Sequence, residues 1–226
     1  CNGYQHNDSF PGSHPLAVGP LGYNGSKAAM QLISKADVVL ALGTRLNPFS
    51  TLPGYGIDYW PKNANIIQVD MNPDRIGLTK KVTVGIAGDA KQVAKQIFDK
   101  LSSNAGDSGR EDRKNLIHQT KSAWLQTLTS LDHEDDDPGT VWNKEARERD
   151  KDRMSPRQAW RAIQAAMPED AIISSDIGNN CAIGNAYPTF EKPRKYLAPG
   201  LFGPCGYGFP SILGAKIGCP DTPVIG

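Results

Sequence analysis

The stretch "DVVLALG" (Asp37 to Gly43) decides the fold class. It is a short, apolar run with β-branched residues, typical of a parallel strand that is buried on both faces. Two further runs, "ANIIQVDM" (Ala64 to Met71) and "VTVGIAG" (Val82 to Gly88), have the same character. Helices are predicted before and after them: "NGSKAAMQLISKA", with Asn24 as N-cap, and "DAKQVAKQIFDKL", with Asp89 as N-cap. This alternation predicts a doubly wound, Rossmann-like α/β domain with a parallel sheet.

A second α/β unit is predicted from Met154 onward. Ser155 as N-cap, Pro156 in the first turn and Gln158 three residues after the cap form the pattern of a capping box. The strand runs "DAIISSDIG" and "RKYLAPG" follow, and each ends in a glycine turn. Carboxyl ends of parallel strands share the sheet edge at which ligands bind in open α/β folds.

The organisation of the chain follows from these units. A polar stretch, "NAGDSGREDR", separates the first unit from a long helix pattern and a charged block. We expect three parts: a middle domain over residues 1–104, a charged helical linker over 105–153, and the beginning of a second α/β domain over 154–226.

Composition excludes several functional classes. The 226 residues carry a net charge of +1, which argues against nucleic acid or an anionic membrane surface as the main partner. No apolar run reaches the ~20 residues of a membrane span, and no signal peptide is recognised, so we expect a cytoplasmic protein. The four cysteines and four histidines lack the spacing of a zinc site, and the cysteines are expected to be reduced thiols.

Two glycine-containing stretches are candidates for a binding site. "SDIGNN" (Ser175 to Asn180) offers backbone N–H groups and amide donors to an anion such as phosphate, but an ordinary strand-to-helix turn has the same pattern. "GLFGPCGYGFPSILGAKIG" (Gly200 to Gly218) suits either tight core packing or a close ligand, and it lacks the GxGxxG fingerprint. Asp70 ends a strand, but no glycine fingerprint precedes it, so we interpret it as a residue that contacts the next turn rather than an NAD ligand.

The order of the motifs resembles the thiamine diphosphate (ThDP) enzymes related to acetohydroxyacid synthase. "PGSHPLAVGPLGYNG", "ADVVLALGTRL", "NIIQVDMNPDRIG" and "GIAGDAKQVAKQI" are similar to the middle domain of that family. "MSPRQAWRAI", "IISSDIGNNCAIGNAYPTFEKPRKYL" and the glycine-rich stretch from Gly200 are similar to the first part of its diphosphate-binding domain. Two segments, "YQHNDSFPGSHPLAVGPLGYNGSKAAM" and "LAPGLFGPCGYGFP", are most similar to the branch that cleaves sulfoacetaldehyde with phosphate, giving acetyl phosphate and sulfite.

The resemblance implies roles for particular residues. The turn Ile177–Asn180, with Gly178 and Asn179, falls where the family contacts the cofactor diphosphate. Gly203 falls where a backbone carbonyl accepts a hydrogen bond from the aminopyrimidine, and Pro204 follows it. Cys205 falls where a bulkier residue, often Met or Ile, supports the bent cofactor.

Other parts of the family's site are expected outside these 226 residues. The Mg²⁺ motif, Gly-Asp-Gly, is expected after Gly226, and the activating glutamate in an N-terminal domain, so this chain should hold no metal and be inactive alone. A homodimer or homotetramer is implied for the full-length protein. Cationic side chains are available for sulfonate and phosphate (Arg45, Lys192, Arg194, Lys195), but a solvated or ion-paired role suits each.

Three alternatives remain at this point. The loop Gly22–Gly25 occupies the position where some relatives hold FAD or ADP, although the branch named above argues against a required flavin. An acetolactate synthase or a 2-oxoacid decarboxylase would share the family's motifs. A non-catalytic nucleotide-binding or oligomerisation module would share the Rossmann-like unit.

Overall fold

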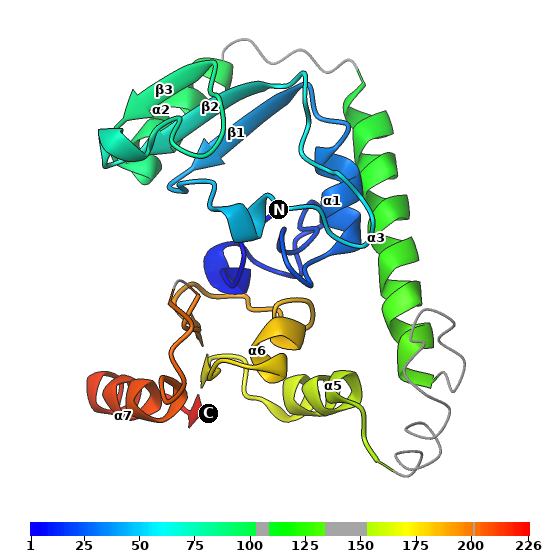
Figure 1. Cartoon of the computed structure of the whole chain (residues 1–226), viewed down its shortest axis with the longest axis vertical. Helices are drawn as coiled ribbons and strands as arrows, with labels where there is room; N and C mark the ends of the chain where they lie inside the picture. Colours follow the sequence, from blue (N-terminus) through cyan, green and yellow to red (C-terminus); the bar gives the residue numbers. More distant parts are fainter. Residues whose placement is uncertain (103–108, 134–152, 201) are drawn as a thin grey trace.

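The computed structural model describes residues 1–102, 109–133, 153–200 and 202–226, which form two small parallel sheets with flanking helices (Figure 1). The first sheet has the order β1-β2-β3 and the second β5-β4-β6. The fold class predicted from the strand runs, α/β with parallel sheets, is therefore confirmed. The helices and strands are α1 (Lys27–Ile33), β1 (Val38–Leu42), β2 (Asn65–Asp70), β3 (Val84–Ala87), α2 (Ala90–Ser102), α3 (Arg110–His133), α5 (Pro156–Ala166), β4 (Ile172–Ser174), α6 (Asn179–Gly184), β5 (Tyr196–Leu197), α7 (Gly208–Gly218) and β6 (Val224–Ile225).

Helix starts follow the sequence signals with one exception. At α5 both halves of the capping box form, since Ser155 accepts from the N–H of Gln158 and Gln158 accepts from that of Ser155. Asp89 caps the first turn before α2. The prediction of Asn24 as N-cap of α1 is wrong: the cap is Ser26, whose Oγ accepts from the N–H of Ala29. Asn24 instead has a left-handed φ of 52° and lies in the preceding turn.

The strand β1 is less buried than its sequence predicts. Val38, Leu40 and Leu42 are 52%, 41% and 40% exposed, whereas Ala41 on the other face is buried with Leu46. Within the described residues β1 is the edge strand of its sheet, so it has a neighbouring strand on one side only. The expectation of burial on both faces is thus wrong for β1, while Val69 of the central strand β2 is fully buried.

Helix α3 connects the two units along one side of the molecule (Figure 1). Its Trp124 and Leu128 are buried against Ala28 of α1. Farther along, Thr129 accepts a hydrogen bond from Arg161 of α5. Residues 103–108, which include the start of the predicted linker at 105, and residues 134–152, which hold most of the charged block, lie outside the described residues. No helix of the described residues is long and apolar enough to span a membrane.

The N-terminal segment, the part of the chain before α1, makes several polar contacts with the second unit. Gln5 N–H donates to Asn185 Oδ1 at 2.8 Å, and Asn185 Nδ2 donates to the carbonyl of Tyr23 at 3.0 Å. The carboxylate of Asp8 accepts from the N–H groups of Lys195 and Tyr196 at the start of β5. Asn185 is fully buried, so these bonds satisfy polar groups that have no access to water.

Candidate cofactor-binding site

The site lies at one edge of the second sheet. Because β4 is parallel to both β5 and β6, the carboxyl ends of these strands meet at the same edge. The segment Ser175–Asn180 follows β4, and residues 198–206 follow β5. The two candidate stretches, separated by 19 residues of sequence, are thereby brought together, as the predicted strand ends require.

Asp176 joins the two stretches. Its carboxylate accepts from the N–H of Ile177 at 2.8 Å and from that of Gly206 at 3.0 and 2.9 Å. A longer bond, 3.4 Å, comes from the N–H of Gly208 at the start of α7. These donors, Ile177 first, hold the pKa of Asp176 below its ordinary value of 3.8, although burial acts in the opposite direction. The charged carboxylate therefore fixes the turn after β4 against the loop after β5.

The turn after β4 presents donors to solvent. Gly178 has φ 134°, is exposed and precedes α6 without a side-chain cap, so it leaves the first N–H groups of the helix open to a ligand. Asn179 is exposed, and Asn180 donates to Ser175 Oγ at 3.2 Å. The carbonyl of Asn180 accepts from the Trp160 indole, which anchors α6 on α5. This arrangement suits an anion such as a diphosphate.

The loop after β5 passes close to that turn. Gly203 has a left-handed φ of 58°, and a Cβ at this position would lie 3.2 Å from Cδ1 of Ile177. Pro204 and Cys205 are exposed, and a Cβ on Gly206 would meet no atom within 4 Å. The loop thus places a bare backbone beside Ile177 and an open surface at Cys205. All seven predicted cofactor residues lie on these two segments (Ile177, Gly178, Asn179, Asn180, Gly203, Pro204, Cys205).

Other candidates lie elsewhere. The ammonium group of Lys195 donates to the carbonyl of Asp170, which precedes β4, so it lies at the opposite edge of the sheet. Asp70 accepts from the N–H of Asn72 at 2.9 Å, as its interpretation as a strand-end residue predicts. In the loop Gly22–Gly25, the candidate position for a flavin or nucleotide, a Cβ on Gly22 would lie 1.9 Å from the carbonyl oxygen of Phe49. Internal packing therefore requires this glycine.

Sequence reasoning missed Asp176 as a site residue. Its signal was present, because a carboxylate lies two residues after a buried strand at the ligand edge, but two of the N–H groups that it binds come from 30 and 32 residues later. Among the described residues, no group of three His, Cys, Asp or Glu side chains is placed to hold a metal ion. The exposed donors after β4 and the bare backbone at Gly203 fit a cofactor with a diphosphate and a flat ring.

Comparison with known proteins agrees with this geometry. The model described as "Thiamine pyrophosphate enzyme, central domain" matches residues 1–97, and "Thiamine pyrophosphate enzyme, C-terminal TPP binding domain" matches residues 176–226. The chain belongs to the thiamine pyrophosphate enzyme family. Thiamine pyrophosphate is ThDP, and the C-terminal match begins at Asp176, the residue that joins the two loops.

Relatives within the thiamine pyrophosphate enzymes differ widely in their sequence identity to this chain. A "Probable sulfoacetaldehyde acetyltransferase" of Rhizobium meliloti is 80% identical over the whole chain, and a "Sulfoacetaldehyde acetyltransferase" of Roseovarius nubinhibens is 77% identical. A "Probable acetolactate synthase large subunit" of Methanococcus aeolicus is 30% identical over 94% of the chain and 34% of its own length. The chain spans 38% of the length of the first two relatives.

Proposed function

We propose that the protein is a ThDP-dependent acyltransferase that converts sulfoacetaldehyde and phosphate to acetyl phosphate and sulfite. The observation that carries the proposal is the 80% identity, over all 226 residues, to a relative with the name sulfoacetaldehyde acetyltransferase. Acetolactate synthases of Methanococcus aeolicus, Corynebacterium glutamicum and Escherichia coli are much more distant, at 30%, 29% and 26% identity. Identity of this order over both units favours a shared substrate over a shared fold alone.

The loop after β4 is proposed to hold the cofactor diphosphate. Gly178 permits close approach, and the N–H groups and amide side chains of Asn179 and Asn180 supply donors to the negative oxygens. The side chain of Ile177, in this turn, lies beside Gly203, so it can contact the cofactor from the apolar side. When bound, ThDP supplies a carbon nucleophile for cleavage next to a carbonyl group. This chain's residues orient that group and hold its charge.

The loop after β5 is proposed to position the aminopyrimidine end. The carbonyl of Gly203 would accept a hydrogen bond from the ring, and Pro204 keeps the adjoining backbone rigid. Cys205 would lie beneath the bend of the cofactor, where its small side chain leaves more room than Met or Ile. Asp176 is proposed as a positioning residue, because its contacts are with the backbone of both loops rather than with open space.

Further parts of the proposal concern the whole protein. We propose Mg²⁺ as the metal partner of the diphosphate, a homodimer or homotetramer, a cytoplasmic location, a role in taurine and sulfonate degradation, and an activating glutamate outside these residues. The division into a middle domain (1–104), a linker (105–153) and a diphosphate-binding part (154–226) also stays a proposal.

The test uses the protein expressed from its complete reading frame. Purified protein is incubated with sulfoacetaldehyde, ThDP and Mg²⁺, with and without phosphate, and sulfite and acetyl phosphate are measured. We expect both products in equal amounts, only when phosphate and ThDP are present. Acetolactate or CO₂ from pyruvate, with no sulfite, would instead identify a synthase or decarboxylase. No turnover of either substrate, with ThDP bound, would contradict the proposal and favour a non-catalytic module.

A further inference from the structure

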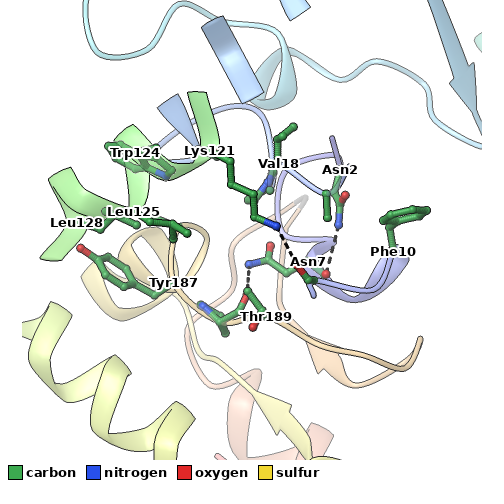
Figure 2. Close-up of a pocket in the computed structure, with 17 residues that line it drawn as sticks. Asn2, Asn7, Phe10, Val18, Lys121, Trp124, Leu125, Leu128, Tyr187 and Thr189 are labelled. Carbon is green, nitrogen blue, oxygen red and sulfur yellow. Dashed lines mark hydrogen bonds between the residues drawn. The ribbon is translucent and has the colours of Figure 1, made fainter. Parts of the chain in front are cut away.

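A pocket of about 110 Å³ lies where the N-terminal segment, α3 and the loop after α6 meet (Figure 2). None of the predicted cofactor residues lines it. Trp124 and Leu128 of α3 are buried in its wall, and Leu125 and Tyr187 extend the same apolar surface. An apolar cavity of roughly 150 Å³ is enough to hold benzene, so this pocket suits a ligand of about six non-hydrogen atoms.

A buried acceptor in the pocket wall has no donor within the described part of the chain. Asn7 is 5% exposed, and its Nδ2 donates to the carbonyls of Asn185 and Pro188 at 3.1 and 2.8 Å. Its Oδ1 is buried without a hydrogen-bond partner among the described residues. Both bonds of Nδ2 fix the orientation of the amide, and Asn7 is one of the residues that line the pocket. A buried, unsatisfied acceptor is costly, so this atom favours a ligand with an O–H or N–H donor.

A cation lies beside this acceptor. Lys121 extends from α3, and its side chain and that of Asn7 point toward each other across the pocket (Figure 2). Lys121 Nζ makes long bonds, 3.3 and 3.5 Å, to the carbonyls of His14 and Gly12. Within the part of the chain that the structure describes, Lys121 forms no ion pair with a carboxylate. An ammonium group in a partly enclosed, largely apolar pocket attracts an anion more strongly than one in open water.

These three features select a ligand class. The anion must lie near Lys121, a donor must face Asn7 Oδ1, and an apolar carbon must contact the wall at Trp124. The donor must be neutral, because a ligand ammonium group would be repelled by Lys121. We propose that this pocket binds a small 2-hydroxy acid, whose hydroxyl and anionic groups are on adjacent atoms and whose alkyl group is short.

The probe is L-lactate, with two analogues that each change one feature. Propionate lacks the hydroxyl donor, and L-alanine replaces it with an ammonium group. Each is titrated, at constant ionic strength, into the protein from the complete reading frame, and tryptophan fluorescence reports on Trp124. We expect saturable lactate binding in the millimolar range that suits so few atoms, and about tenfold weaker binding of both analogues. Loss of the signal in Trp124→Phe assigns it to this pocket.

Variants of α3 separate the effect of the Lys121 charge on lactate binding from the effect of removing any lysine charge from the helix. Lys121→Met keeps the apolar stem and is expected to weaken lactate binding about tenfold, whereas Lys121→Arg retains most of it. Lys114→Met is the matched control, since Lys114 lies on the same helix, is exposed and pairs with Glu111. The proposal is overturned if lactate, propionate and alanine bind equally or not at all, or if folded Lys121→Met binds lactate as wild type does. If Lys121→Met does not fold, the comparison of the three probes on wild type decides.

Discussion

Asp176 holds the loops after β4 and β5 together with one carboxylate. Asp176→Ala removes the acceptor for the N–H groups of Gly206 and Gly208, so the loop after β5 loses its attachment to the turn after β4. We expect ThDP to bind roughly tenfold more weakly, because these bonds involve a charged acceptor. Fluorescence titration with ThDP measures the change. Asp58→Ala is the control, since Asp58 is exposed and contacts Lys62 outside the site; an equal loss in both variants would contradict the role of Asp176.

The pH dependence of this link follows from the direction of the pKa shift. Hydrogen bonds lower the pKa of Asp176 below 3.8 in the folded protein. A lowered carboxyl pKa stabilises the fold above the unfolded-state pKa, and this contribution is lost as the pH falls through the folded-state pKa. The link therefore stays intact at all pH values above about 4. The ratio of ThDP affinities between wild type and Asp176→Ala should be the same at about pH 6 and 8; a ratio that collapses between these values would contradict the shift.

Asn185 connects the N-terminal segment to the second unit from a fully buried position. Asn185→Ala leaves the Gln5 N–H and the Tyr23 carbonyl without their partners. Because each buried, unsatisfied group costs about 1–3 kcal/mol, we expect roughly 3 kcal/mol of destabilisation and a lower thermal midpoint. Differential scanning fluorimetry of the full-length protein measures it, with the exposed Asn63→Ala as control. Equal midpoints for the two variants would show that the segment does not depend on Asn185.

At the scale of elements, α3 is attached to the first unit by one face. Leu128 is 6% exposed and packs with Ala28 and Trp124, whereas Leu125 on the same helix is 50% exposed. Leu128→Ala should cost about 2–5 kcal/mol, because it leaves a cavity between α3 and α1, and Leu125→Ala should cost less than about 1 kcal/mol. Urea unfolding monitored by circular dichroism compares the two. A larger effect of Leu125→Ala would mean that α3 packs through a different face.

The sequence could predict those elements that local patterns determine, and it could not predict features that depend on tertiary contacts. Short apolar runs and the capping box at Ser155 are local patterns, and β2, β4 and α5 formed where those patterns lie. Burial of β1 was not predictable, because its exposure depends on which strands and helices lie beside it. Asn185 gave no signal either, since its partner Gln5 is 180 residues away. For the site, the edge could be predicted from strand ends, but the donors of Asp176 depend on the tertiary fold.

At the scale of the whole molecule, two parallel sheets, α3 and the N-terminal segment form one arrangement (Figure 1), and the proposed ThDP site lies at the carboxyl edge of the second sheet. The segment Gln5–Asp8 contacts the second unit at Asn185 and at the start of β5, so it attaches the first unit to the second. The chain spans 38% of the length of the relatives named sulfoacetaldehyde acetyltransferase. Activity therefore has to be measured on the product of the complete reading frame.

We propose that the two loops joined by Asp176 hold ThDP. The most direct test of this proposal is a crystal structure of the full-length protein with ThDP and Mg²⁺. We predict the diphosphate within hydrogen-bond distance of the N–H groups after Gly178, and the aminopyrimidine beside the Gly203 carbonyl. A diphosphate bound away from the turn after β4, or an aminopyrimidine that does not approach Gly203, would contradict the account.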